Sequence, residues 1–194
     1  MAATVTARPA PAVLPDVLCA GLDIVFCGTA AGAASARRGA YYAGPGNAFW
    51  PTLFSVGLTP RQLAPEEFRK VVGCGLGLTD MAKAVSGSDR DLPAGSFDAG
   101  RLERAVRRHR PAILAFTSKR AAAEYFGCAV AYGLQSMGIG ATRVFVLPSP
   151  SGAARAHWDE SWWRELARLK TGLRRSAAKT RGRPAPAAQL RPIR

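Results

Sequence analysis

The sequence predicts an α/β fold, with a three-layer α/β/α architecture around a central, mainly parallel sheet. The first observation is a set of short apolar runs typical of buried strands, LDIVFC, GLGLTDM, AILAFTS and RVFVL. The second is that segments with helical spacing separate these runs along the chain. This alternation predicts parallel strands, because a helix that follows each strand packs on the sheet and returns the chain to its starting edge.

Each element in the first half of the chain has its own signal. Strand LDIVFC leads into a glycine-punctuated loop over 28–47, and the apolar residues of NAFWPTLFSVGL then follow a helical face that ends near Gly57. TPRQLAPEEFRKVVGCG predicts a short helix with Thr59 as N-cap and Pro60 at the first helical position. GLGLTDM predicts a short buried strand that ends at Thr79 and Asp80.

The second half continues the same alternation. FDAGRLERAVRRHR predicts a helix with a basic exposed face that stops before Pro111, and AILAFTS predicts the next strand. KRAAAEYF predicts a helix that Gly127 ends, and RVFVL predicts a last strand that runs into a Pro/Ser/Gly loop. DESWWRELARLK predicts a closing helix with Asp159 as its N-cap.

The domain organisation follows from length and composition. A chain of 194 residues with 48% hydrophobic and 21% charged residues suits one globular domain, which we place at residues 16–170. Residues 1–15 are expected to form a flexible lead. Residues 171–194 contain no Asp or Glu and are rich in Pro, Ala and Arg, so we expect a basic disordered tail.

Several classes of protein and site are disfavoured by what the sequence lacks. No apolar run approaches the roughly 20 residues that a membrane span needs, and the N-terminus has no pattern of a secretory signal, which favours a cytoplasmic location. The four cysteines include no CxxC pair, so we expect no zinc or iron–sulfur site, with Cys27 and Cys74 as buried thiols. The segment GTAAGAAS lacks the glycine spacing of nucleotide-binding loops.

The charge balance predicts the class of partner. Lys and Arg number 27 against 13 acids, for a formal charge of +14. Such an excess favours a polyanion, most simply nucleic acid, although a generally basic protein is the alternative. Ligands of parallel sheets bind at the carboxyl ends of the strands. Three candidate loops meet there, at 28–47, 79–80 and 149–155.

These loops carry motifs in register that resemble the uracil-DNA glycosylase superfamily, in particular its mismatch-specific uracil- and thymine-DNA glycosylases. The motifs are YYAGPGNAFW, VGLTPRQL, GLGLTD and LPSPSGAAR, and the resemblance spans about Leu22 to Lys170. It implies hydrolysis of the N-glycosidic bond of uracil, or of a related deaminated base, in single- or double-stranded DNA after base flipping, leaving abasic DNA. It implies no metal or other cofactor, and we expect a monomer. Leu147 stands where the uracil-specific branch has a histidine, which disfavours that branch.

The resemblance also implies roles for residues around the base. Tyr42 matches the aromatic residue that stacks on the flipped base, with a buried core tyrosine as the alternative. Ser35 lies where the family places a small polar residue near the base edge. Backbone N–H groups of the glycine loop, at Gly28, Ala30 and Gly32, could meet a base carbonyl.

The last loop resembles the segment that the family inserts into DNA. Ser149, Ser151 and Gly152 are expected to hold phosphates through hydroxyl and backbone N–H groups. Ala153 and Ala154 replace the usual bulky wedge, which makes single-stranded substrate more plausible. Arg155 is expected to contact a phosphate or the facing base.

The catalytic loop departs from the family at one position. The family places Asn or Asp at the third position of this motif to hold the hydrolytic water, and here Gly-Thr-Ala-Ala-Gly places Ala30 there. Three candidates could replace it, in the order Asp80, Asn47 and Thr29. Two alternatives stay open: hydrolysis could need little activation of water, or the protein could bind damaged or abasic DNA without hydrolysis.

Overall fold

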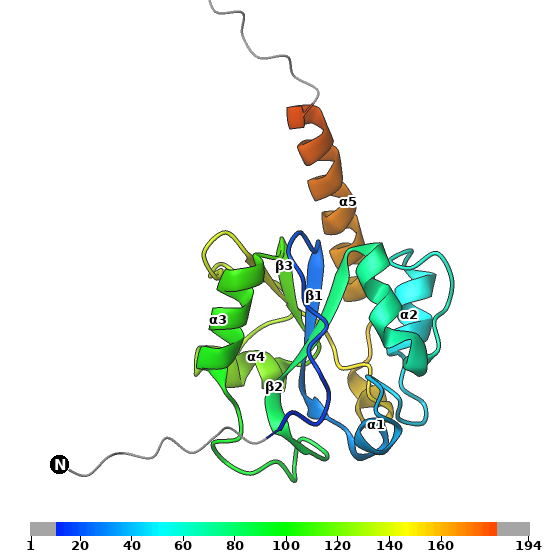
Figure 1. The fold of residues 1–194 in the computed structure, drawn as a ribbon, viewed down its shortest axis with the longest axis vertical. Helices are drawn as coiled ribbons and strands as arrows, with labels where there is room; N and C mark the ends of the chain where they lie inside the picture. Colours follow the sequence, from blue (N-terminus) through cyan, green and yellow to red (C-terminus); the bar gives the residue numbers. More distant parts are fainter. Residues whose placement is uncertain (1–10, 182–194) are drawn as a thin grey trace, which may run out of the picture.

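The structure is a computed structural model that describes residues 11–181. Its centre is a five-stranded sheet in the order β2-β1-β3-β5-β4 (Figure 1). The strands are β1 (Ile24–Ala31), β2 (Leu76–Ser86), β3 (Ile113–Phe116), β4 (Gly133–Leu134) and β5 (Arg143–Val146). All neighbouring pairs are parallel except β4 with β5. The predicted α/β class with a mainly parallel central sheet is confirmed; the short edge strand β4 was not predicted.

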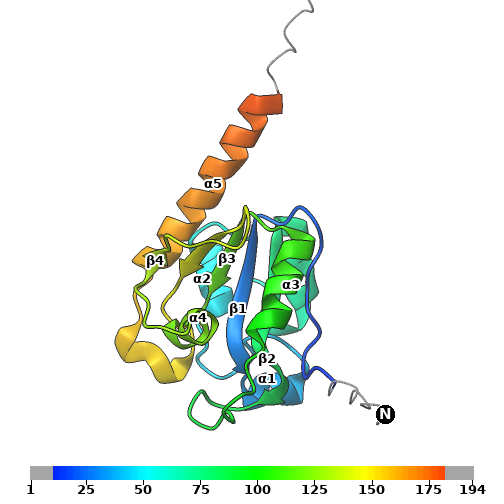
Figure 2. The same cartoon turned by 90° about the vertical axis from the view of Figure 1, so that its left-hand side faces the viewer.

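Helices cover both faces of this sheet (Figures 1 and 2). The α-helices are α1 (Ala33–Arg38), α2 (Phe49–Ser55), α3 (Ala99–His109), α4 (Lys119–Phe126) and α5 (Ser161–Arg181). Two 3-10 helices are η1 (Pro65–Cys74) and η2 (Gly152–His157). One hydrophobic cluster joins the sheet to α2, η1 and α5, and a second joins its other face to α3 and α4.

The alternation of side chains along β1 explains the two clusters. Ile24 and Phe26 enter the cluster that contains Trp163 of α5, whereas Val25 and Cys27 enter the cluster that contains Leu102 of α3. A strand buried on both faces must be apolar at every position, which is why the sequence shows a continuous run and not an alternating one. The core therefore fixes the strand ends, from which the site is built.

The N-terminal segment covers the outer edge of β2. The backbone N–H of Val13 donates to the carbonyl of Lys83 at 2.7 Å, and Val17 forms an antiparallel bridge with Leu78. Leu14 is only 1% exposed. The described end of the expected flexible lead is thus packed against the sheet, because an open strand edge leaves backbone groups that need partners. Residues 1–10 of that lead lie outside the described residues.

Helix α5 extends past the expected domain boundary at residue 170. Lys170 is buried, and its ammonium group donates to the carbonyl of Cys74 at 2.6 Å. The helix continues to Arg181, so residues 171–181 differ from the disordered tail that composition predicted. Ala, Lys and Arg are good helix formers, and the first proline of this segment comes only at Pro184. The remainder of the expected tail, 182–194, lies outside the described residues.

Several element boundaries differ from the sequence prediction. The predicted N-cap at Thr59 is wrong, because the helix is a 3-10 helix that begins at Pro65, where the Glu67 carboxylate accepts from the backbone N–H of Ala64 at 3.0 Å. β2 continues six residues past Asp80 to Ser86, and β1 and α1 occupy much of the expected loop 28–47. Asp159 accepts from the backbone N–H of Ser161 at 2.9 Å, as expected for a residue that caps the start of α5.

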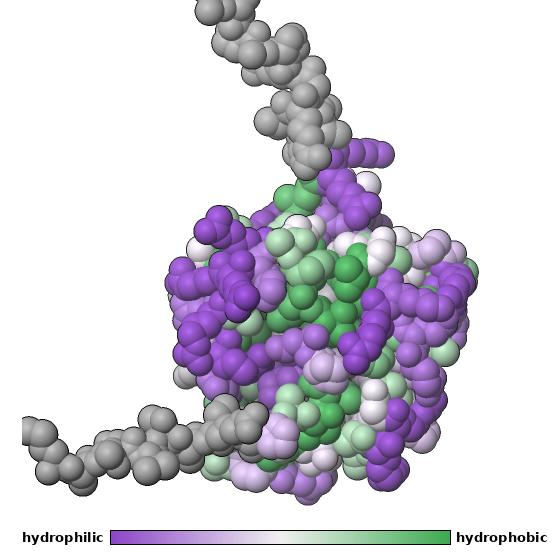
Figure 3. Space-filling model, viewed as in Figure 1, coloured by the Kyte–Doolittle hydropathy of each residue, from purple (hydrophilic) through white to green (hydrophobic). Residues whose placement is uncertain are grey.

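The helix predicted to carry a basic exposed face does so. Along and just after α3, the side chains of Arg104, Arg107, Arg108 and Arg110 are exposed, and Leu102 and Val106 face the core. In the space-filling view, the surface over α3 is correspondingly hydrophilic (Figure 3).

Candidate active site

A cavity of about 660 Å³ lies at the carboxyl ends of the parallel strands. Its lining combines the end of β1 and the start of α1 with Asp80 of β2, the residues after β3 and the loop after β5. Residues from the three segments that the sequence singled out, 28–47, 79–80 and 149–155, therefore meet at one place. A parallel sheet requires this convergence, because all its carboxyl ends lie on the same edge.

Asp80 contributes a buried carboxylate to the cavity. Its side chain belongs to the middle of β2 and not to a loop, and the residue is 4% exposed. Burial raises the pKa of Asp80 to about 6 from its usual 3.8, although Lys83 and Arg101 act in the opposite direction. A carboxyl group with a pKa near the working pH can serve in acid–base or electrostatic catalysis.

Gly28 makes room for this carboxylate. Gly28 pairs with Asp80 in the parallel register of β1 and β2. A Cβ on Gly28 would lie 2.6 Å from Asp80 Oδ1 and 3.5 Å from the hydroxyl of Tyr42. Glycine is therefore required here for close packing, and the contact of its N–H group with a base carbonyl stays a prediction.

Tyr42 has an unusual backbone conformation, with φ of 54°. This left-handed region is uncommon for a bulky residue and often marks a functional site. The ring of Phe49 stacks on Tyr42 with a centroid distance of 3.7 Å and an interplanar angle of 13°. The Tyr42 hydroxyl lies 3.2 Å from Thr117 Oγ1. Tyr42 is thus held by contacts with Phe49 and Thr117 while it lines the cavity.

Ser35 and Thr29 are both buried and both occupied by protein contacts. Ser35 Oγ accepts from the backbone N–H of Ala43 at 3.0 Å, which ties α1 to the loop that carries Tyr42. Thr29 Oγ1 lies 3.1 Å from Ser118 Oγ. Both residues line the cavity, but these contacts give each a bracing role that the sequence did not show.

Asn47 lines the cavity with its amide held in one orientation. Asn47 Oδ1 accepts from the backbone N–H of Phe49 at 2.9 Å, next to the start of α2. With the carbonyl oxygen bound in this way, the Nδ2 group is the part of the amide available to donate a hydrogen bond to a ligand.

The loop after β5 packs against the loop that contains Asn47. The backbone N–H of Ala48 donates to the carbonyl of Pro150 at 2.8 Å, and a Cβ on Gly152 would approach the carbonyl oxygen of Pro45 to 3.1 Å. Because Gly152 has no side chain, the two loops can approach closely enough to form one wall of the cavity.

The residues expected to bind DNA lie in or beside this wall. Ser149, Ser151, Ala153 and Ala154 line the cavity. The segment from Gly152 onward is the 3-10 helix η2 and not an open loop. Arg155 is exposed, with its guanidinium beside Gly46 at the rim.

The structure adds residues that the sequence analysis missed. Thr117 and Ser118 follow β3 directly and line the cavity, as does the segment 87–90 after β2. The hydroxyl residues at the end of AILAFTS were a usable signal, since they occupy the carboxyl end of a predicted parallel strand. Lys83, which contacts Asp80, had no such signal in the sequence, because its other partners, Asp16 and Tyr41, come from distant segments.

Ala30 occupies the cavity lining without any polar side-chain atom. It belongs to β1, where it pairs with Ala82, and a bulge follows between Ala30 and Ala31. Asp80, Asn47 and Thr29 line the same cavity. The three candidates proposed to replace a polar residue at position 30 are therefore brought together.

Within residues 11–181, no three His, Cys, Asp or Glu side chains are grouped as a metal ion would require. Cys27 is buried, as predicted, whereas Cys74 is partly exposed. In the same range, no helix has the length and apolar character that crossing a bilayer demands.

Comparison with known proteins decides the family. The model of the uracil DNA glycosylase superfamily matches residues 15–169. The chain belongs to the uracil DNA glycosylase superfamily. Among solved structures, it is similar to the solution NMR structure of a proposed uracil DNA glycosylase from Methanosarcina acetivorans, with 24% identity and a TM-score of 0.54 over 81% of this chain and 96% of that one. At this identity, the likeness shows the fold alone.

Proposed function

We propose that this protein is a DNA glycosylase that hydrolyses the N-glycosidic bond of uracil in single- or double-stranded DNA and leaves an abasic site. The proposal includes other deaminated bases as substrates. It also assigns the protein to the mismatch-specific branch of the superfamily, on the basis of its sequence motifs. The observation that carries it is one cavity of a superfamily member that contains the Asp80 carboxylate, the Tyr42 ring and the Asn47 amide.

Tyr42 would hold the base after it leaves the stack. One face of its ring is covered by Phe49, so a base can stack only on the opposite side. Base–aromatic stacking contributes about 1–3 kcal/mol and tolerates different bases. This contribution offsets part of the cost of unstacking and flipping the nucleotide.

Polar groups of the cavity would then distinguish deaminated bases from their parents. Uracil carries N–H at N3, where cytosine has a lone pair, and hypoxanthine differs from adenine in the same way at N1. An ionised Asp80 accepts a hydrogen bond from N–H but repels a lone pair. The Asn47 amide and backbone N–H groups near Gly32 would donate to base carbonyl oxygens.

The same groups suit the chemical step. The bond between C1′ of the sugar and the base nitrogen breaks, and its electron pair leaves with the base while positive charge develops on the sugar. Water then adds at C1′ through its oxygen and loses a proton, which the departed base anion takes up to give the neutral base. Hydrogen-bond donors stabilise the departing base, and a carboxylate stabilises the cationic sugar or orients the water. Asp80 is our first candidate for this carboxylate role, followed by Asn47 and Thr29 for holding the water.

DNA would approach over the wall formed by the loop after β5. Ser149 and Ser151 offer hydroxyl and backbone N–H groups to phosphates, and Arg155 adds a positive charge at the rim. We expect the protein to act as a monomer in the cytoplasm and without a cofactor, leaving abasic DNA as product.

The test uses labelled oligonucleotides with one uracil, in single- and double-stranded form. After incubation, alkali cleaves any abasic site, and the products are separated on a gel. We expect cleavage by the wild type, a strong loss in Asp80→Asn, and no change in Glu103→Gln, which removes a carboxylate from the exposed face of α3. No cleavage, together with retained binding to uracil or abasic DNA, would replace this proposal by the damage-binding function that Ala30 favours.

A further inference from the structure

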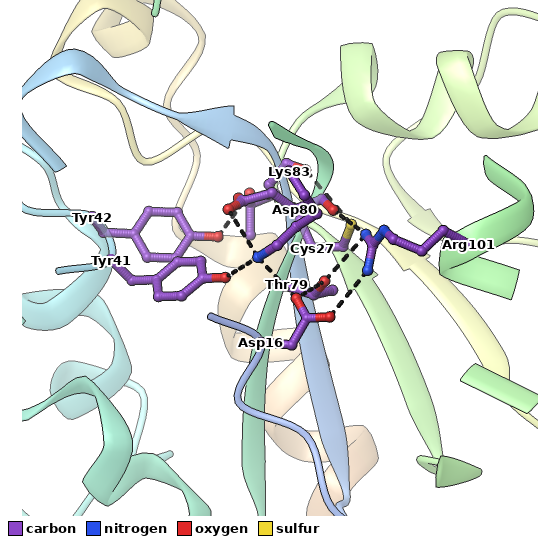
Figure 4. A network of polar contacts seen from close by, with 10 residues as sticks. Asp16, Cys27, Tyr41, Tyr42, Thr79, Asp80, Lys83 and Arg101 are labelled. Carbon is purple, nitrogen blue, oxygen red and sulfur yellow. Dashed lines mark hydrogen bonds and ion pairs between the residues drawn. The ribbon is translucent and has the colours of Figure 1, made fainter. Parts of the chain in front are cut away.

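The ammonium group of Lys83 lies between the buried carboxylate of Asp80 and the more exposed carboxylate of Asp16 (Figure 4). The Lys83 side chain is only 11% exposed. Its Nζ atom is 2.8 Å from Asp16 Oδ1 and 4.0 Å from Asp80 Oδ2, and it donates to the Tyr41 hydroxyl at 2.9 Å. A largely buried ammonium group in this position favours the ionised form of both carboxylates.

Asp16 is the carboxylate nearer to the Lys83 ammonium group. Asp16 also accepts from Thr79 Oγ1 at 2.7 Å and from Arg101 Nη1 at 3.0 Å. The other end of the Arg101 guanidinium donates to the backbone carbonyl of Asp80. Three donors from β2 and α3 thus converge on Asp16, which keeps Lys83 in contact with Asp16 and at a greater distance from Asp80.

Asp80 has to be ionised for each role proposed for it: accepting the N–H of a base, orienting water or stabilising a cationic sugar. Burial opposes ionisation of Asp80. Among the surrounding groups, some raise the pKa of Asp80 and others lower it. Those that raise or lower the pKa of Asp80 are Lys83 of its own strand, Arg101 of α3, Asp16 of the N-terminal segment and Tyr41 after α1. Tyr42 and the Cys27 thiol of β1 face Asp80 in neutral form, since burial raises the pKa of each.

We propose that Lys83 is a positioning residue for base excision, which keeps Asp80 ionised inside the cavity wall, and that Asp16 limits this effect by holding the ammonium group. This inference rests on the proposed function of the same site. It assigns opposite effects to two residues that share one ion pair: loss of the Lys83 charge makes Asp80 easier to protonate, and loss of the Asp16 charge makes it harder.

The first test is the pH dependence of single-turnover uracil excision from single-stranded DNA. Lys83→Met keeps the length of the side chain without its charge, and Asp16→Asn keeps the shape without the charge. We expect the acid limb of the rate profile to move up by about one pH unit in Lys83→Met and down in Asp16→Asn. Lys83→Arg should restore a profile near that of the wild type.

The controls separate a change of charge from a loss of structure. Lys70→Met removes an exposed lysine of η1 and should leave the profile unchanged. Thermal unfolding shows whether each variant is folded, and Asp16→Asn provides a second test if Lys83→Met does not fold. Rates that fall by one factor at every pH, or limbs that move in the same direction in both variants, would overturn the proposal.

A second measurement does not depend on activity. Carbon-13 NMR of the aspartate carboxyl groups follows the protonation of Asp80 in the free protein, with Asp80→Asn to assign the signal. The midpoint should shift in opposite directions in Lys83→Met and Asp16→Asn, and a midpoint unchanged in both would overturn the charge effect. If the midpoints shift as expected and the wild type excises no base, the proposed function fails while control of the Asp80 charge by Lys83 stands.

Discussion

Asp80 Oδ1 lies against the backbone of Gly28, so close that a Cβ on Gly28 would be only 2.6 Å away. The two residues pair across neighbouring parallel strands, which places the carboxylate over Gly28 in the second half of β1, where the cavity lining begins. This contact joins the glycine motif to the acid of β2 and explains why a small residue is needed at position 28.

Gly28→Ala should therefore disable the site. The added methyl group would displace the Asp80 carboxylate, and a misplacement of about 1 Å in a catalytic group can cost on the order of 100-fold in rate. Single-turnover excision measures the loss. Gly73→Ala is the matched control, because a Cβ there meets nothing within 4 Å. Equal rates in Gly28→Ala and the wild type would show that the position of Asp80 does not limit excision.

Substitution of Tyr42 should separate stacking from general DNA binding. We expect Tyr42→Ala to weaken binding to uracil-containing DNA by about 1–3 kcal/mol and to leave binding to undamaged DNA nearly unchanged. Tyr42→Phe keeps the ring and loses only the contact with Thr117. In fluorescence-anisotropy titrations, the affinity of Tyr42→Phe for both DNAs should stay close to that of the wild type. The same loss on both DNAs would assign Tyr42 to the core instead.

The raised pKa of Asp80 predicts that this residue destabilises the fold at neutral pH. Between pH 3.8 and about 6, the native state binds the Asp80 proton more tightly than the unfolded state does. Stability therefore falls as pH rises through this window, by up to ~3 kcal/mol for a shift of about two pH units. This cost already includes the attraction of Asp80 to Lys83 and Arg101, so we expect Asp80→Asn to gain up to ~3 kcal/mol of stability at pH 8.

Urea unfolding at pH 8 and pH 4 checks this prediction. The advantage of Asp80→Asn should shrink at pH 4, where the wild-type carboxyl group is mostly neutral in the native state. Asp89→Asn serves as the control, because Asp89 is exposed and should give little change at either pH. A destabilised Asp80→Asn at pH 8 would mean that the attraction to Lys83 and Arg101 outweighs the cost of burial.

Ala153 should determine how the protein treats duplex DNA. Its small side chain lies in the cavity wall where a bulky wedge would support a flipped base. Ala153→Leu is expected to raise excision from duplex DNA several-fold relative to single-stranded DNA, because an apolar wedge stabilises the unstacked step. Ala156→Leu, on an exposed residue of the same 3-10 helix, is the control. An unchanged ratio of the two rates would remove Ala153 from the DNA contact.

Arg155 should contribute to affinity in a salt-dependent manner. The formal charge of +14 predicts that binding weakens steeply as salt rises. If Arg155 contacts a phosphate, Arg155→Gln should reduce the slope of log K against log salt by about one. The change should be the same for uracil and undamaged DNA. A slope equal to that of the wild type would place Arg155 away from the phosphates.

The sequence by itself determined the positions of four of the five strands, the helices α3 and α4, and the convergence of three segments at one cavity. These follow from local patterns: continuous apolar runs for strands buried on both faces, and polar residues at their carboxyl ends. Composition was less reliable at the domain boundaries, because Leu14 packs on the sheet and α5 continues to Arg181. The family motifs pointed to Tyr42 and Asp80 before any contact was known.

Only the tertiary structure decided how these residues are held. Ser35 braces the loop of Tyr42, Thr29 meets Ser118, and Lys83 shares its charge between Asp16 and Asp80. Each of these contacts joins residues that are far apart in the sequence or on elements whose register the sequence does not state. The charge of Asp80 depends on burial and on the sum of such contacts. Local sequence patterns can predict that a carboxylate lies in a site, but the packing around the carboxylate determines its protonation.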